Sequence, residues 1–263
     1  MIFLKHIQIP GLRTKEPRGL YLYLPEDYAR SQARYPVLYM FDGHNVFYDS
    51  HATYGKCWGM KEYLEAAGTP VILAAVECNH EGNRRLWEYA PWSFQSRDFG
   101  LIRGQGKQTM DWIVSSLKPE IDRTLRTLPD RAHTWIAGSS MGGLMSLYAV
   151  TAYNSIFSRA AALSPSLWAG GWQLQRLIRQ TSLENPTRIY MDVGTAELPP
   201  EKHGSFAALF KTAALLTRSG ADVAARLIPG GEHNEAAWEK RIPTFFDYLG
   251  PLVPEAEGKE AEA

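Results

Sequence analysis

Short apolar runs alternate along this chain with longer segments of helical periodicity, and this alternation limits the folds open to it. Runs of strand character cover residues 2–9, 19–24, 37–41, 71–77, 133–137, 159–163, 188–193 and 223–228. Segments of helical spacing cover residues 58–67, 108–128, 142–153, 172–180, 205–219 and 235–249. Such alternation is typical of a mostly parallel sheet with helices on both faces. We therefore predict an α/β fold with an eight-stranded sheet, in which the first two strands are antiparallel because no helix separates them.

The length of the chain fits one domain. It has 263 residues, and α/β folds of this size regularly form a single hydrophobic core. No internal repeat or linker divides the sequence, so residues 1–250 are expected to form one domain. Residues 251–263 are rich in Glu, Ala, Gly and Lys and could bury almost nothing, so we expect a disordered tail there.

Charge and cysteine content exclude several kinds of partner. The 28 basic and 28 acidic side chains balance, which argues against a nucleic acid or an anionic membrane as a partner. The first residues contain no apolar stretch typical of a signal peptide, so a cytoplasmic location is expected. Cys57 and Cys78 show no metal-ligand spacing. Both are expected to be reduced, buried and without a metal. No cofactor is expected either.

One segment departs from the regular alternation. Residues 79–106 carry Trp87, Tyr89, Trp92 and Phe94 among charges and glycines, without helical or strand periodicity. A long irregular segment in a compact domain is usually functional or disordered, and four aromatic side chains argue against disorder. We expect this segment to pack beside a functional site.

A serine framed by glycines stands between a strand-like run and a helical run. Residues 138–143 read GSSMGG, with TWIA before them and LMSLYAV after them. This strand-turn-helix setting is the one in which Gly-x-Ser-x-Gly presents a nucleophile, and it makes Ser140 the candidate. Ser139, the neighbouring hydroxyl, has no glycine two residues before or after it and is the weaker candidate. The following helix directs free N–H groups at the site, and the N–H of Met141 is the natural first donor to an oxyanion.

Two histidines follow Ser140 in the chain and could serve as its base. His233 follows the strand-like run 223–228 and precedes a helix, so it lies at the end of a strand. His203 lies among prolines and a glycine at the approach to a helix, where a solvated or capping histidine is common. In a strand-turn-helix site of this kind, the acid and then the histidine follow the serine along the chain, so His233 is the favoured base.

Two carboxylates compete for the role of the acid. Asp192 lies inside the predicted strand 188–193, whereas Glu197 lies in the loop beyond its carboxyl end. A carboxylate that orients the imidazole must reach it from the rim where the strands end. This favours Glu197 and leaves Asp192 as the alternative.

With these residues in place, the chain resembles the putative-esterase, or esterase-D-like, family of α/β hydrolases. The resemblance extends from about Tyr21 to Leu249 and rests on motifs in order: YPVLYMFDG at 35–43, RLWEYAPW at 85–92, KPEID at 118–122, AGSSMGGL at 137–144, LSPSLW at 163–168, DVGTAE at 192–197 and GGEH at 230–233. The family includes feruloyl and acetyl-xylan esterases of carbohydrate esterase family 1, enterochelin-type esterases, S-formylglutathione hydrolases and mycolyltransferases.

The resemblance implies roles for individual residues. It places a catalytic triad at Ser140, Glu197 and His233, and the second oxyanion donor in the turn after the third strand, at the backbone N–H of His44. It also places Gly43, Trp58 and Trp168 at the substrate pocket, although a tryptophan can equally be a packing residue.

The expected activity is that of a serine carboxylic-ester hydrolase that forms an acyl-enzyme. Its substrate would be a small or carbohydrate-linked ester of the acetyl or feruloyl type. A siderophore trilactone esterase of the enterochelin type and an acyltransferase that uses the same acyl-enzyme are the alternatives, and a non-catalytic binding protein is a third. The sequence leaves the acyl group, the alcohol and the oligomeric state open.

Overall fold

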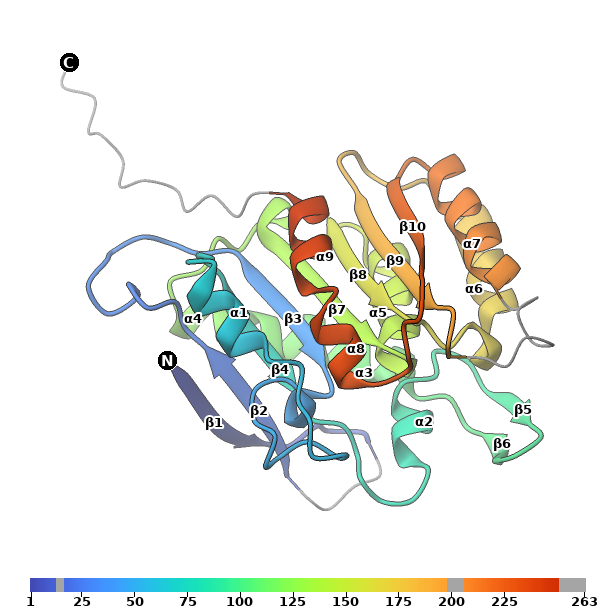
Figure 1. The fold of residues 1–263 in the computed structure, drawn as a ribbon, viewed down its shortest axis with the longest axis horizontal. Helices are drawn as coiled ribbons and strands as arrows, with labels where there is room; N and C mark the ends of the chain where they lie inside the picture. The colour runs from blue at the N-terminus through green and yellow to red at the C-terminus, as the bar shows by residue number, and fades with distance from the viewer. Residues whose placement is uncertain (13–16, 198–205, 251–263) are drawn as a thin grey trace.

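The computed structural model describes residues 1–12, 17–197 and 206–250. The predicted tail at 251–263 and the alternative base His203 lie outside the described residues. The chain folds around an eight-stranded sheet with helices on both of its faces (Figure 1). In the described part of the chain, no helix is both long and apolar enough to cross a membrane.

The sheet has the order β1-β2-β4-β3-β7-β8-β9-β10. β1 pairs with β2, and β2 with β4, in antiparallel fashion, and all the other neighbours are parallel. The strands are β1 (Ile2–Ile7), β2 (Arg18–Tyr23), β3 (Val37–Phe41), β4 (Ile72–Val76), β7 (Thr134–Ser139), β8 (Arg159–Leu163), β9 (Arg188–Gly194) and β10 (Asp222–Ile228). This confirms the predicted α/β class, the eight strands and the antiparallel start.

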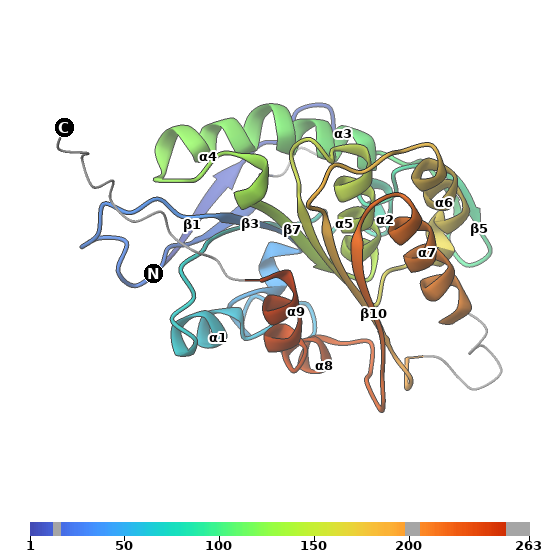
Figure 2. The ribbon, with the colours of Figure 1, turned by 90° about the horizontal axis from the view of Figure 1, so that it is seen from above.

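Side chains alternate between two cores, because successive residues of a strand point to opposite faces. In β3, Val37, Tyr39 and Phe41 enter one core, whereas Leu38 and Met40 enter the other. The first core lies under α3 (Gly106–Trp112), the π-helical turn η2 (Ile113–Leu117), α4 (Lys118–Thr124), α5 (Met141–Ala152), α6 (Gly171–Arg179) and α7 (Phe206–Arg218). The second lies under α1 (Met60–Ala66), α8 (Glu235–Glu239) and α9 (Ile242–Leu249), on the opposite side of the sheet (Figure 2).

Two predicted elements differ from the structure. The segment 235–249 forms two helices, because Pro243 at the start of α9 has no N–H to continue α8. The segment 79–106 contains α2 (Arg84–Glu88) and a small hairpin of β5 (Phe94–Ser96) and β6 (Gly100–Ile102), whose elements are too short to show periodicity. A short 3-10 turn, η1 (Gly43–Asn45), follows β3.

A buried ion pair fastens this aromatic segment to the sheet. Arg18 of β2 donates to the carboxylate of Glu88, and both side chains are 4% exposed. The same carboxylate accepts the N–H of Asn79 at 3.0 Å. A buried charge is tolerated when it is paired and hydrogen-bonded, so this contact holds α2 close to the end of β4.

Candidate active site

Ser140 stands at a sharp turn between β7 and α5. Its backbone has φ 56° and ψ −120°, a conformation that costs a non-glycine residue about 1–3 kcal/mol. The turn is held by the neighbouring β8 loop, since the Ser140 N–H donates to Leu163 O and the Ser166 N–H donates to Ser140 O, both at 2.9 Å. Met141 is the first residue of α5, so its N–H has no partner inside the helix.

The glycines around Ser140 allow this turn to pack closely. A Cβ on Gly138 would lie 2.7 Å from the carbonyl carbon of Gly142, and one on Gly143 would lie 2.9 Å from the oxygen of Leu163. Both contacts are with backbone atoms, which cannot rotate away. Glycine is therefore required at 138 and 143 by the geometry.

His233 is held by Glu197. The Nδ1 of His233 lies 2.8 Å from Oε2 of Glu197, and the histidine side chain is 42% exposed while the carboxylate is 5% exposed. The ring also packs edge-on against Trp238, with ring centroids 5.0 Å apart. These contacts leave Nε2 as the ring nitrogen that faces away from the acid, which is the arrangement of a general base.

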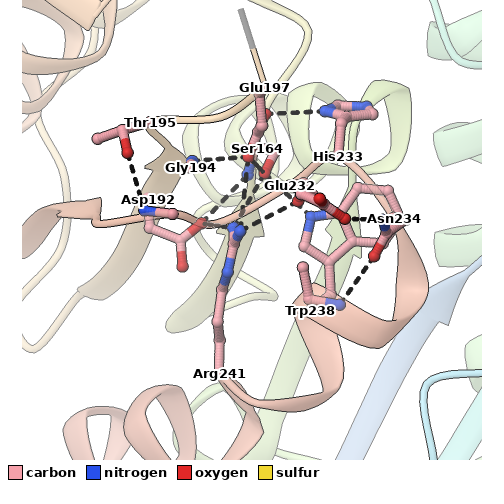
Figure 3. Close-up of polar contacts among 12 residues, drawn as sticks. Ser164, Asp192, Gly194, Thr195, Glu197, Glu232, His233, Asn234, Trp238 and Arg241 are labelled. Atoms are coloured by element: carbon pink, nitrogen blue, oxygen red, sulfur yellow. Dashed lines mark hydrogen bonds and ion pairs between the residues drawn. The ribbon is translucent and has the colours of Figure 1, made fainter.

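The other oxygen of Glu197 is fixed by two donors. It accepts the hydroxyl of Ser164 at 2.5 Å and the N–H of Gly194 at 2.6 Å (Figure 3). Burial by itself raises the pKa of Glu197, but the hydrogen bonds from His233, Ser164 and Gly194 outweigh it and hold the pKa below its usual value. The carboxylate therefore stays ionised and oriented.

Ser164 joins this carboxylate to a buried polar cluster. Its Oγ accepts the indole N–H of Trp238 at 3.0 Å and an N–H of Arg241 at 3.1 Å. Figure 3 shows the Arg241 side chain reaching up from the start of α9 to lie among these groups. Arg241 is 3% exposed and also bonds Oδ1 of Asp192 at 2.9 Å.

Asp192, the alternative acid, lies beneath the rim. Its side chain is fully buried. One carboxylate oxygen accepts a hydrogen bond from Arg241, and the other accepts one from the hydroxyl of Tyr190 at 2.8 Å. Among the described residues it makes no hydrogen bond to His233. The geometry therefore brings Glu197 to the imidazole, and it gives Asp192 the role of counter-ion to Arg241.

Ser140 and His233 both follow strands at the same rim of the sheet. The hydroxyl of Ser140 lies 3.2 Å from the hydroxyl of Ser166, and within the part of the chain that the structure describes it makes no hydrogen bond to His233. The sequence places Ser140 after β7, Ser166 after β8 and His233 after β10. A hydrogen bond between a nucleophile and its base often forms only when substrate is bound.

The turn after β3 supplies further N–H groups near Ser140. Asp42 adopts the left-handed conformation with φ 59°, and the N–H groups of Gly43 and His44 make no backbone hydrogen bond to any described residue. A Cβ on Gly43 would lie 2.5 Å from Ala75 O, so only glycine fits there. This is the turn in which the second oxyanion donor was expected.

Arg85 locks the turn in place. Its Nε and Nη2 each bond one oxygen of Asp42 at 2.7 Å, and the Asp42 N–H donates to the hydroxyl of Tyr89 at 3.1 Å. Burial alone raises the pKa of Asp42, but the charge and hydrogen bonds of Arg85 hold it below its usual value. Arg85 and Tyr89 both come from the aromatic segment 79–106, which therefore packs beside the turn after β3, as predicted.

A pocket of about 450 Å³ opens between His233 and the 3-10 turn η4 (Leu167–Ala169). Its wall combines the polar groups of the site with apolar side chains: Ser164, Pro165, Ser166, Leu167, Trp168, Val193, Glu197, Phe206, Ala208, Leu209 and His233. Trp168 is 59% exposed. Trp58, in contrast, is 2% exposed and stacks on Trp238 with centroids 5.8 Å apart, so it is a packing residue behind the imidazole and does not line the pocket.

Several residues of the site were not singled out from the sequence. Ser164 and Ser166 lie in the LSPSLW motif, and Arg85 in the RLWEYAPW motif, but their roles depend on contacts between distant segments. Arg241 gave little signal in the sequence, because it follows Glu239 and Lys240 in a run of charged residues. A buried arginine of this kind needs an acidic partner.

Comparisons with known proteins agree with these features. The chain matches the putative esterase family over residues 12–248. It is 27% identical to the uncharacterized protein YbbA of Bacillus subtilis over 186 residues, which cover 68% of this chain and 69% of YbbA. It is 28% identical to esterase Rv1288 of Mycobacterium tuberculosis over 146 residues, which cover 56% of this chain but only 28% of that protein.

Solved structures share the fold. An IroE-like serine hydrolase from Shewanella oneidensis superposes with a TM-score of 0.74 at 23% identity, over 95% of this chain and 79% of the other. The enterobactin and salmochelin hydrolase IroE gives a TM-score of 0.66 at 19% identity, over 95% of each chain. A ferulic acid esterase gives 0.65 at 14% identity, over 95% of this chain and 97% of the other. The sheet and its helices are thus those of the α/β-hydrolase fold.

Replacing Ser164 by alanine tests the polar cluster. The change removes the acceptor of two buried donors, on Trp238 and Arg241, and a donor to Glu197, so the free energy of unfolding should fall by about 1–3 kcal/mol. Urea unfolding followed by fluorescence measures this loss. Ser182→Ala, at an exposed serine, is the matched control and should change stability by less than about 0.5 kcal/mol. Equal stability of the two variants would contradict the cluster's role.

Proposed function

The chain belongs to the putative esterase family, and from this premise we propose that it is a serine carboxylic-ester hydrolase. The observation that carries the proposal is the imidazole of His233, held at 2.8 Å by the buried Glu197 on the rim where Ser140 stands at its strained turn. A serine beside a histidine that is oriented by a carboxylate is the constellation of an activated nucleophile.

In the proposed reaction, His233 takes the proton of Ser140 as the serine oxygen attacks the ester carbonyl. The resulting oxyanion is stabilised by the N–H groups of Met141 and His44. His233 then gives its proton to the leaving alcohol, which leaves the acyl group on Ser140. Water attacks this acyl-enzyme with His233 as the base, and the acid is released.

The proposed substrate is a small or carbohydrate-linked ester of the acetyl or feruloyl type. The pocket beside His233 is large enough for an aromatic acyl group, and the exposed ring of Trp168 on its wall offers a stacking surface. A neighbouring fold is that of a ferulic acid esterase, which supports the feruloyl choice.

A siderophore ester is the second candidate. The likeness to an IroE-like serine hydrolase, at a TM-score of 0.74, and to IroE itself favours it. A catecholate ring would use the same stacking surface as a feruloyl ring. Rates on enterobactin and on methyl ferulate, measured with the same preparation, separate the two candidates.

Ser140→Ala should abolish hydrolysis of p-nitrophenyl acetate and butyrate. Removal of the nucleophile is expected to lower kcat by at least about 10⁴-fold while the fold persists. The release of p-nitrophenol measures activity, and labelling by a fluorophosphonate probe reports on the serine itself. Ser139→Ala is the control and should keep both labelling and most of the activity. Substantial hydrolysis by Ser140→Ala would overturn the assignment.

Glu197→Gln and Asp192→Asn distinguish the two acids. Glu197→Gln should lower kcat by about 10²–10⁴-fold, because the imidazole loses its anionic partner. Asp192→Asn should instead reduce the free energy of unfolding by about 3–5 kcal/mol, since Arg241 loses its closest carboxylate, and should lower kcat less than Glu197→Gln does. Steady-state kinetics and urea unfolding of both variants provide the comparison. The reverse pattern would assign the acid to Asp192.

Trp168→Ala tests the stacking surface. Loss of ring contact should lower kcat/KM for methyl ferulate about 10-fold, which corresponds to about 1.4 kcal/mol, and lower it much less for p-nitrophenyl acetate. Trp172→Ala is the control, because Trp172 is 66% exposed and does not line the pocket. Equal behaviour of the two variants on methyl ferulate would place the aromatic group elsewhere.

A further inference from the structure

The ends of β3 and β4 bring three metal-ligating side chains together beside the proposed oxyanion turn. The two strands are parallel neighbours with Phe41 opposite Val76, so the residues that follow them meet at one edge of the sheet. One ligand atom from each of His44, Cys78 and His80 lies within 4.8 Å of the other two. None of the three side chains has a part in the proposed proton transfers, which use His233.

The imidazole of His44 is buried with one nitrogen unused. Its Nε2 lies 3.0 Å from Oγ1 of Thr53, whereas Nδ1 is buried and has no hydrogen-bond partner among the described residues. His44 is 4% exposed, and with the ring proton on Nε2, where Thr53 can accept it, Nδ1 carries the lone pair. A buried acceptor without a partner costs free energy that a bound ion would recover.

His80 is oriented in the same way. Its Nε2 lies 2.9 Å from a carboxylate oxygen of Glu77, which leaves Nδ1 for another partner. A histidine whose second nitrogen is held by a carboxylate or hydroxyl is the usual arrangement behind a metal ligand. The rings of His44 and His80 meet edge to face, with centroids 4.4 Å apart.

We propose that His44, Cys78 and His80 form a binding site for one zinc-class divalent ion. A thiolate with two imidazoles suits Zn²⁺ or Co²⁺, which take three protein ligands and leave a fourth position for water. On binding, the Cys78 thiol releases its proton to solvent as the metal–sulfur bond forms, and each imidazole donates the lone pair of one unprotonated ring nitrogen. No oxidation or reduction takes place.

Zinc binding would draw the three ligand atoms closer together. Zinc bonds of about 2.3 Å to sulfur and about 2.0–2.1 Å to nitrogen bring tetrahedral ligand atoms closer together than the 4.8 Å limit found here. The His80 side chain is 51% exposed, so it can turn toward the buried pair and also gives an ion access from solvent. Cys57, the other free cysteine, is buried and does not belong to this cluster, which makes it the matched control.

The test is a Co²⁺ titration of the full chain after treatment with a chelator. We expect one ion per chain, with the near-ultraviolet charge-transfer absorption of a cobalt–thiolate bond, and displacement of Co²⁺ by Zn²⁺. Cys78→Ser should remove this absorption, and His80→Ala should weaken binding at least about 10-fold. Cys57→Ser should behave as the unaltered protein.

Three results would overturn the proposal: no stoichiometric binding, binding without the thiolate absorption, or binding that His80→Ala leaves unchanged. His80 is exposed, so its variant stays informative even where Cys78→Ser disturbs the fold. Circular dichroism of each variant shows whether it is folded. No ester is present in the titration, so the outcome is independent of the proposed esterase activity.

Discussion

The buried ion pair of Asp192 and Arg241 is the contact that supports the candidate site at the rim of the sheet. Asp192 is fully buried and Arg241 is 3% exposed, so each charge relies on the other. A buried pair of this kind contributes little net stability compared with apolar packing, but loss of one member is costly because the other charge remains. Its effect here is geometric: with Asp192 engaged below the rim, Arg241 holds Ser164, and Ser164 in turn holds Glu197 against His233.

Backbone strain gathers at the same edge of the sheet. The three non-glycine residues with positive φ in the described ranges are Asp42, Ser140 and Ser164, and each directly follows a strand. Those strands, β3, β7 and β8, are neighbours. Each such residue costs about 1–3 kcal/mol and persists only when its surroundings hold it. Here the holding contacts are Arg85 on Asp42, the β8 loop on Ser140, and Arg241 with Trp238 on Ser164.

Much of this arrangement follows from local sequence, and the remainder depends on contacts between distant segments. The strand 37–41 has the predicted bounds because its five apolar residues are buried on both faces, which is visible in the sequence. The preference for Glu197 over Asp192 rested on the rule that loops after parallel strands share one rim, and the contact with His233 has that geometry. Arg241 could not be paired in advance with Asp192, because 49 residues separate them and no periodicity links them. The same holds for His44 and Cys78, which become neighbours only through the pairing of β3 with β4.

In the reaction that we propose, the exposure of His233 bears on whether water or an alcohol receives the acyl group. The His233 side chain is 42% exposed, while the Glu197 side chain is 5% exposed. A buried carboxylate therefore orients an imidazole that is itself in contact with solvent. His233 also lines the pocket. A transferase must keep water from the acyl-enzyme long enough for a second alcohol to bind, which calls for a closed or apolar site around the base. A half-exposed histidine does not provide such a site, which supports the proposed hydrolysis over transfer.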